Sequence, residues 1–188
     1  RDRSPSRGLG DVYKRQEKGK IVEKCDYWLK WDDLQVSEGA AKVTGWTQKK
    51  YDEKSIDPVA PISHFDKYLY DPEYLKVGHN ILGFDVYMHG LCRRLLNQKP
   101  DYSFLPQLID TLALSRAIQG DILYNNEDDF LLWQYKVMSL RSSKGRNKLI
   151  DLCKKYDIPF DPKKLHDALY DIEKNYEVFK KLIWEIEI

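Results

Sequence analysis

The sequence predicts an α/β domain in which a mixed sheet is flanked by helices. Residues 21–31 alternate apolar and polar side chains, the pattern of a half-buried strand. Two short apolar runs, 76–78 and 105–109, have the length and composition of buried strands. Residues 80–96 and 164–186 carry apolar side chains at helical spacing, which predicts helices with one face on the core.

Composition sets broad limits on this domain. A chain of 188 residues with 42% hydrophobic residues is long enough to bury one core. Thirty-one basic residues against thirty acidic ones give a net charge of +1, which neither requires nor excludes nucleic acid as a partner. We find no apolar run of transmembrane length and no apolar segment typical of a signal peptide, so we expect a cytoplasmic protein.

The three cysteines, Cys25, Cys92 and Cys153, are odd in number and widely spaced. Two of them lie on apolar faces of predicted helices, which favours reduced thiols packed in the core. We find no Cys/His spacing typical of a zinc site.

Residues 1–16 differ in composition from the rest of the chain. The first ten have almost no apolar side chains, which predicts disorder. Residues 11–16 resemble a translated sequencing-library adapter, and this interpretation divides the chain into a disordered scar, 1–16, and a domain, 17–188. The alternative is a basic arm that binds nucleic acid.

The first half of the domain begins with a predicted turn at 18–20 that leads into the strand 21–31. Residues 40–47 end in a Gly-Trp-Thr turn. Trp46 in this turn either stacks on a nucleotide base or packs beneath its own loop. Prolines at 58 and 61 precede a predicted helix over 62–69.

The helix predicted from Asn80 carries a carboxylate among its apolar residues. Asn80 is a candidate N-cap, because its side chain can accept hydrogen bonds from the first turn. Asp85 shares the apolar stripe, where its charge needs a cation or hydrogen-bond donors. It therefore either contributes to a site or caps a neighbouring loop. The stripe itself comprises Ile81, Phe84, Met88, Cys92 and Leu95.

Asp110 and Thr111 stand between the strand 105–109 and a predicted helix over 112–119. Asp110 is a candidate cap for that helix, and a second possibility is that it also faces a metal cleft. Residues 120–143 show no clear period, which suggests an insertion. A further helix is predicted over 148–156.

The C-terminal helix has a second acidic residue close to its apolar seam. Asp171 lies on the shoulder of that seam. His166 precedes it by five residues, which is about 140° around a regular helix, so the two share a site only if His166 lies in the loop that enters the helix. Otherwise His166 is a cap or a surface residue. The predicted seam consists of Leu169, Ile172, Tyr176, Phe179, Ile183 and Ile186.

Three segments together resemble the DEDDh 3′–5′ exonucleases, the family of RNase T and of the proofreading subunit of bacterial replicative polymerases. The segments are His79-Asn80-x-x-x-Phe84-Asp85, Ile109-Asp110-Thr111-Leu112 and His166-x-Ala168-Leu169-x-Asp171. They occur in the family's order over roughly residues 19–184, from the family's second motif to its third.

This resemblance implies an RNase H-like fold and two divalent ions, Mg²⁺ or Mn²⁺. Asp85 and Asp171 would be metal ligands and His166 the general base. We further expect Asn80, Phe84 and Trp46 to contact substrate, with His79 and Asp110 as possible secondary site residues. The expected substrate is a nucleic acid 3′ end, single-stranded or frayed, with DNA favoured over RNA, and the products are nucleoside monophosphates. A polymerase or a second copy of the chain is a possible partner.

The chain departs from this family in one respect. The family's first strand carries an Asp-x-Glu-Thr-Thr-Gly-Leu-like stretch with two further metal ligands, and the sequence contains no such stretch. We therefore expect a sheet that lacks its first, central strand and a fragment with little activity. The alternatives are a catalytically dead RNase H-like module for binding or scaffolding and an α/β interaction domain with chance motif matches.

Overall fold

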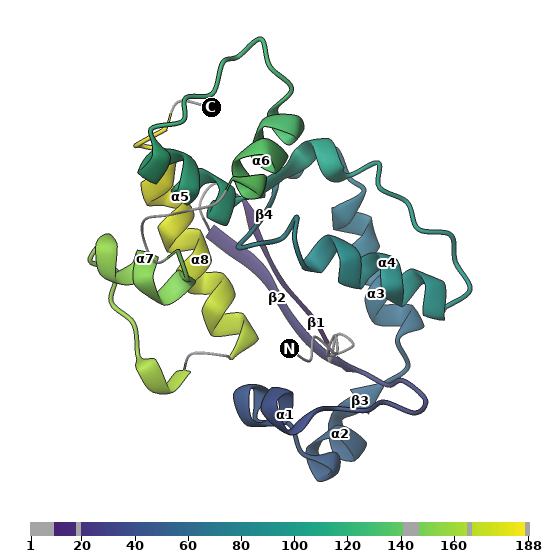
Figure 1. Cartoon of the computed structure of the whole chain (residues 1–188). Helices are drawn as coiled ribbons and strands as arrows, with labels where there is room; N and C mark the ends of the chain where they lie inside the picture. The colour runs from purple at the N-terminus through teal and green to yellow at the C-terminus, as the bar shows by residue number, and fades with distance from the viewer. Residues whose placement is uncertain (1–9, 18–19, 141–146, 165–166, 187–188) are drawn as a thin grey trace.

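The strands form two sheets with helices on both sides (Figure 1). The computed structural model describes residues 10–17, 20–140, 147–164 and 167–186. No helix within these segments is long and apolar enough to cross a membrane. In chain order the elements are β1 (Gly10–Glu17), β2 (Lys20–Leu29), α1 (Glu38–Thr44), α2 (Gln48–Lys54), β3 (Ser55–Ile56), α3 (Val59–Leu69), β4 (Lys76–Gly78), α4 (Asp85–Leu95), the 3₁₀ turn η1 (Leu105–Gln107), β5 (Leu108–Asp110), α5 (Thr111–Gly120), α6 (Phe130–Ser139), α7 (Leu149–Lys155), the 3₁₀ turn η2 (Pro162–Lys164) and α8 (Ala168–Leu182).

The first sheet is built on the β1–β2 hairpin. β1 pairs antiparallel with β2 from Gly10↔Trp28 to Glu17↔Lys20, and β3 adds a short parallel pair at the far edge of β2. Disorder over residues 1–16 is therefore wrong for residues 10–16, because their backbone groups pair with those of β2. Residues 1–9 lie outside the described segments, and the adapter origin stays a prediction.

The second sheet consists of β4 and β5, which pair in parallel from Lys76↔Leu108 to Gly78↔Asp110. Within the described segments, no strand pairing joins this sheet to the first. β1 and β4 are therefore edge strands, and the backbone of each has one side open to a further strand. The predicted mixed α/β architecture is confirmed, with its strands divided between two sheets.

Helices cover the hairpin on both faces. α7 and α8 lie on one side of it and α3 and α4 on the other (Figure 1). The largest apolar cluster joins β5, α5, α6, α7 and α8, with Leu114, Ala117, Val178 and Leu182 fully buried. Burial of a leucine or valine side chain contributes about 1.5–3 kcal/mol. This cluster holds α8 against the carboxyl end of β5.

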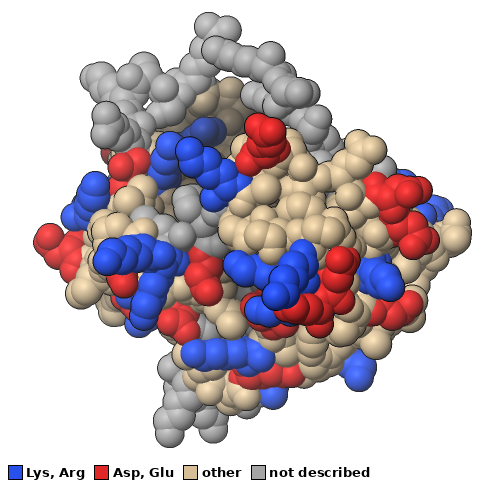
Figure 2. Space-filling view, turned by 90° about the horizontal axis from the view of Figure 1, so that it is seen from below, with Lys and Arg blue, Asp and Glu red and all other residues tan. Residues whose placement is uncertain are grey.

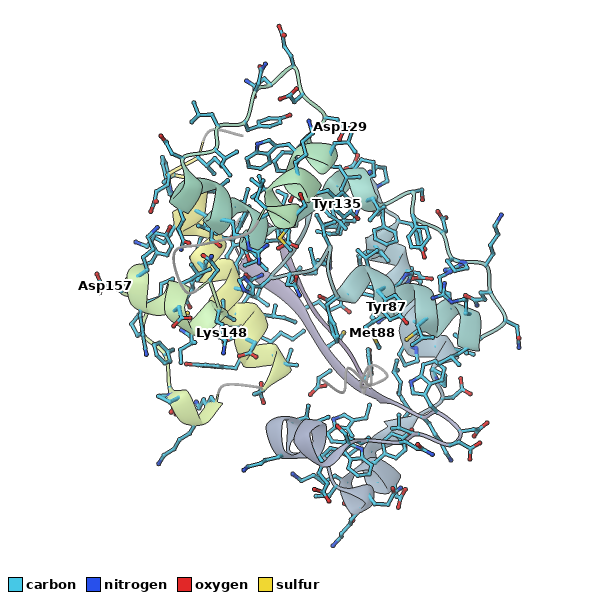
Figure 3. The ribbon with its side chains drawn as sticks, viewed as in Figure 1. Tyr87, Met88, Asp129, Tyr135, Lys148 and Asp157 are labelled. Atoms are coloured by element: carbon cyan, nitrogen blue, oxygen red, sulfur yellow. The ribbon has the colours of Figure 1, made fainter. Side chains whose placement is uncertain are left out.

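Two helix predictions need correction. α4 begins at Asp85 and has Phe84 at its N-cap position, so Asn80 is not its N-cap. Asn80 instead lies in the preceding loop with φ +62°, a conformation that short polar residues tolerate. Phe84 and Leu95 of the predicted inward stripe are exposed, whereas Met88 (Figure 3) and Cys92 are buried.

The apolar seam of α8 is also displaced from its predicted position. The buried residues are Asn175, Val178 and Leu182 on the helix, followed by Ile186 beyond it, while Ile183 is exposed. Asp171 precedes Asn175 by four residues, so both lie on the same helix face. The helix face of Asp171 and Asn175, which was predicted to lie at the edge of the apolar seam, is therefore the face that packs against the domain.

The segment predicted as an insertion contains α6, which Asp129 caps by accepting a hydrogen bond from the Leu132 amide (Figure 3). Aromatic stacking of Phe130 on Trp133, with ring centroids 5.7 Å apart, fixes the start of this helix in the core. The segment is thus an integral part of the fold.

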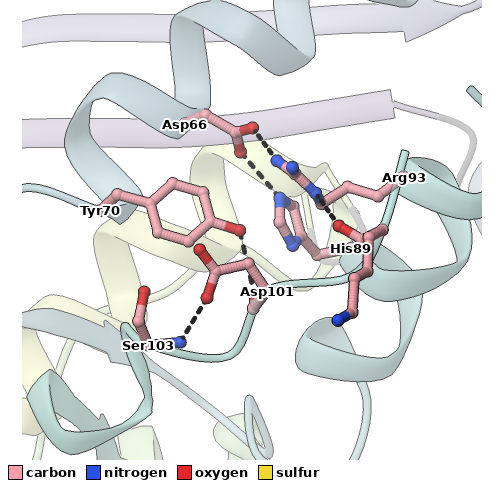
Figure 4. A network of polar contacts seen from close by, with 7 residues as sticks. Asp66, Tyr70, His89, Arg93, Asp101 and Ser103 are labelled. Carbon is pink, nitrogen blue, oxygen red and sulfur yellow. Dashed lines mark hydrogen bonds and ion pairs between the residues drawn. The ribbon is translucent and has the colours of Figure 1, made fainter.

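A polar network joins α3 to α4 (Figure 4). The Asp66 carboxylate lies 2.8 Å from His89 Nε2 and 2.6 Å from Arg93 Nη1. Arg93 also lies over the ring of Tyr70, and burial raises the pKa of that tyrosine to about 12. Because Asp66 on α3 contacts both His89 and Arg93 on α4, the network sets the position of α4, and hence of Asp85 at its start.

Candidate functional site

The candidate site lies where β4 and β5 end. Residues 79–84 follow β4, and Asp110 closes β5 at the same end of the parallel pair. In α/β proteins, ligands bind beyond the carboxyl ends of parallel strands. Polar side chains of both segments are therefore brought together next to α8.

Asp110 organises this end of the sheet. Its Oδ1 accepts hydrogen bonds from the amides of Asn80 and Leu112, both at 2.9 Å, and its Oδ2 accepts one from Leu82 at 3.1 Å. The predicted capping of α5 is confirmed. With no exposed surface, Asp110 has no face with which to meet an ion, so we assign it a role in holding the 79–84 loop.

Asn80 and Gly83 give that loop its shape. The Asn80 carbonyl accepts hydrogen bonds from the amides of Gly83 and Phe84 at 3.1 and 3.0 Å. A Cβ on Gly83 would stand 2.5 Å from Asn80 Oδ1, so a larger residue there would displace the Asn80 side chain. Asn80 therefore shapes the loop that leads into Asp85.

Asp85 is exposed to solvent at the first turn of α4, yet neighbouring protein atoms partly desolvate its carboxylate. This burial, opposed by a hydrogen bond from its own backbone and reinforced by the negative charge of Asp110, raises its pKa to about 6. A carboxylate with a raised pKa gains from a nearby cation, because the cation stabilises the charged form. Solvent access leaves room for such a cation.

Thr111 connects the strand ends to α8. Its hydroxyl donates to Asn175 Oδ1 at 2.7 Å and lies 3.0 Å from His79 Nδ1. Burial lowers the pKa of His79, with the charge of Asp110 acting in the opposite direction, so this imidazole is neutral near pH 7. The chain of contacts fixes the orientation of α8 relative to both strands.

Asp171 lies one helical turn before Asn175 and is half-buried. Its charge raises the pKa of the Cys153 thiol on α7, an effect smaller than that of the burial of the thiol. The structure thus places Asp171 on the packed face of α8, one turn from the residue that Thr111 contacts.

Three further residues were predicted to belong to the site, namely Phe84, Trp46 and His166. Phe84 is 45% exposed beside Asp85. Trp46 is half-buried and lies against Tyr51, with ring centroids 6.2 Å apart, and the Tyr51 hydroxyl accepts a hydrogen bond from the Trp31 amide; stacking of Trp46 on a base stays a prediction. His166 lies outside the described residues.

The sequence alone does not indicate that the side chains of Thr111 and Asn175 contact each other. They are 64 positions apart, and each reads by itself as an ordinary polar residue in a helix. The one indication in the sequence that Asn175 lies near the site is that it shares a helix face with Asp171. Tertiary packing is required to bring the two side chains together.

Charge is mixed over the face seen from below. Lysine, arginine and acidic side chains alternate there without a continuous patch of one sign (Figure 2). A nucleic-acid site on this face would therefore depend on local groups more than on a broad positive field.

The fold is similar to that of two solved structures of exonuclease I. A structure of exonuclease I that suggests how processivity is achieved matches with a TM-score of 0.64 and 19% identity, over 87% of this chain and 33% of that one. Exonuclease I from E. coli in complex with a dA16 oligonucleotide matches with a TM-score of 0.64 and 21% identity, over 92% of this chain and 35% of that one. The chain thus spans about a third of the length of both.

These matches define the class of the protein as an RNase H-like α/β fold. No curated protein sequence matches the chain. The exonuclease family model of the RNase T type matches residues 11–179, and the chain belongs to that exonuclease family.

Proposed function

We propose that the protein is a 3′–5′ exonuclease domain that removes nucleoside monophosphates from single-stranded or frayed nucleic acid, with DNA favoured over RNA. Membership of the exonuclease family supports hydrolysis. The observation that carries the proposal is the contact of Thr111 with Asn175 at the carboxyl ends of β4 and β5, with Asp171 one helical turn before Asn175 and with Asp85 close enough to Asp110 to feel its charge. The oligonucleotide bound to E. coli exonuclease I supports DNA as the substrate.

The donor set suits hard divalent cations. Carboxylate oxygens are the ligands that Mg²⁺ and Mn²⁺ prefer, and Asp85 and Asp171 come from different helices, so they could approach an ion from different sides. The partly desolvated but solvent-reachable carboxylate of Asp85 fits this role. Two ions held here would stabilise the attacking hydroxide and the leaving 3′ oxygen.

Other residues would orient substrate and move protons. His166 would take the proton from the attacking water, since an imidazole titrates near neutral pH. The exposed ring of Phe84 would pack against the terminal nucleotide. Asn80 would act through the shape of the 79–84 loop, and Trp46 would contribute only the part of its ring that Tyr51 leaves uncovered.

Two carboxylates are too few to hold two divalent ions. We therefore propose that residues 1–188 alone have little nuclease activity, and that a strand bearing an Asp-x-Glu-Thr sequence completes the site. The unpaired edges of β1 and β4 are the positions where such a strand would join the described strands.

The test compares single-stranded DNA labelled at its 3′ or its 5′ end, with Mg²⁺, Mn²⁺ or EDTA present. The enzyme is a longer polypeptide in which an Asp-x-Glu-Thr strand precedes residue 10. We expect immediate release of the 3′ label as a mononucleotide in Mg²⁺ or Mn²⁺ and none in EDTA. Asp171→Asn should lower the rate at least about 100-fold, whereas Asp52→Asn, a surface change on α2, should leave it unchanged.

Release of the 5′ label first, or equal rates in Asp171→Asn and Asp52→Asn, would contradict the proposal. Binding of the oligonucleotide without any hydrolysis would instead support the catalytically dead module. The same assay with RNA of matched sequence measures the sugar preference.

A further inference from the structure

A second constellation of ligand-type side chains lies between β2 and α3. Glu23 and Cys25 alternate along β2, so both side chains project from the same face of the sheet. His64 on α3 faces them, and one ligand atom from each of the three lies within 4.8 Å of the others. Lys24, the residue between them, projects to the opposite face and pairs with Glu173 on α8 at 2.8 Å. The constellation is therefore separate from the carboxylates of the candidate active site.

The spacing of these atoms matches that of ligands around one ion. Glu23 Oε1 lies 3.7 Å from Cys25 Sγ and 3.3 Å from His64 Nε2. Ligand atoms bound tetrahedrally to Zn²⁺ at about 2.0–2.3 Å stand roughly 3.3–3.5 Å from one another. Small side-chain adjustments would place the three around a common centre.

The contacts of these side chains allow either a proton or a metal ion to join Glu23 and His64. The Tyr27 hydroxyl donates to Cys25 Sγ at 3.6 Å, and the Cys25 thiol donates to Glu23 Oε1 at 3.7 Å. Tyr27 Oη also lies 3.4 Å from His64 Nδ1. His64 Nε2 faces Glu23 Oε1 at 3.3 Å, a distance that a protonated imidazole or a shared metal ion accommodates.

We propose that Glu23, Cys25 and His64 form a Zn²⁺ site that links β2 to α3. Thiolate and imidazole ligands prefer Zn²⁺ over Mg²⁺, which distinguishes this site from Asp85 and Asp171. On binding, Cys25 loses its thiol proton to solvent and the sulfur, imidazole nitrogen and carboxylate oxygen each donate an electron pair to the metal. A water molecule completes the tetrahedron.

Neighbouring groups support each ligand. The Tyr27 hydroxyl lies 3.6 Å from Cys25 Sγ and can donate a hydrogen bond to that sulfur. Arg15 Nε lies 3.5 Å from Glu23 Oε2, which leaves Oε1 directed at the site. Supporting contacts of this kind orient metal ligands, and their loss lowers affinity by about 10–100-fold.

The test is substitution with Co²⁺, which is a spectroscopic probe for tetrahedral sites. We expect one Co²⁺ per chain, with a sulfur-to-metal charge-transfer band and intense visible bands, both displaced by Zn²⁺ and not by Mg²⁺. Cys25→Ser should abolish the charge-transfer band, His64→Ala should weaken Zn²⁺ binding more than about 100-fold, and Tyr27→Phe should keep the bands with affinity about tenfold lower.

The control is Cys153→Ser, which removes a buried thiol elsewhere in the core and should retain every band. Circular dichroism of each variant identifies any loss of fold. If a ligand variant does not fold, Tyr27→Phe, which keeps all three ligands, still tests the site. Absence of the charge-transfer band in the wild-type chain, or its persistence in Cys25→Ser, would overturn the proposal. Nuclease activity does not enter these measurements, so the result is independent of the proposed function.

Discussion

At the scale of single residues, the chemistry of the candidate site depends on where each carboxylate lies. Asp85 and Asp110 are both acidic residues at helix starts, but Asp110 is saturated by three amides with no exposed surface, whereas Asp85 is open to solvent. Identical side chains therefore have different roles. Asp110 builds the loop, and Asp85 is available to an ion.

The raised pKa of Asp85 makes stability depend on pH. Because its pKa is about 6 in the folded chain and 3.8 as a free group, the stabilising effect of its protonation is complete below about pH 4 and is lost as pH rises through 6. Asp85→Asn should thus stabilise the metal-free chain at pH 8 by about 1 kcal/mol, after discounting for solvent screening, with a smaller effect at pH 4.

Urea unfolding in EDTA at both pH values measures this difference. Asp32→Asn, an exposed change between β2 and α1, is the matched control and should have no such pH-dependent effect. Equal stability of Asp85→Asn and wild type at pH 8 would show that Asp85 does not carry an unfavourable charge.

At the scale of elements, close packing sets the path from β4 into the site loop. Gly78 ends β4, and Ile81 folds back over it within the turn that begins at His79. α3 and α4 meet through Asp66, His89 and Arg93, which fixes the direction in which α4 leaves this loop (Figure 4). The loop is thus constrained at both ends.

Two glycines in the chain should respond oppositely to substitution by alanine. A Cβ at Gly78 would stand 2.7 Å from Ile81 Cβ, so Gly78→Ala should destabilise the chain by about 1–3 kcal/mol through overpacking. A Cβ at Gly39 in α1 meets nothing within 4 Å, so Gly39→Ala should stabilise it by up to about 1 kcal/mol through helix propensity. Thermal unfolding of both variants checks the signs, and a neutral Gly78→Ala would mean that the loop is looser than described.

At the scale of the whole molecule, the separation of the two sheets is the main structural feature. The parallel β4–β5 pair and the β1–β2–β3 sheet share no strand pairing in the described segments, although α8 contacts both. A strand between the sheets would pair both open edges, and in the proposed function it would also bring the further carboxylates that two metal ions need. Stability and activity are therefore expected to change together.

We predict that residues 1–188 expressed alone are poorly soluble and show little nuclease activity. Addition of a preceding Asp-x-Glu-Thr strand should raise the unfolding temperature by roughly 5 °C or more, since pairing two edges and covering apolar surface contributes several kcal/mol. Calorimetry and the end-labelled assay measure the two effects. High, cooperative thermal stability of residues 1–188 alone would contradict this prediction.

The sequence by itself determined the α/β class, most element positions, the capping by Asp110 and the exonuclease resemblance, because these follow from local periodicity and short motifs. It misplaced the N-cap of α4 and the seam of α8, where loop conformation and packing outweigh local pattern. Only the tertiary structure decided the Thr111–Asn175 contact and the Glu23–Cys25–His64 constellation. Asn175 is 64 positions from Thr111, and His64 is far in sequence from Glu23 and Cys25, so only chain folding brings these side chains together.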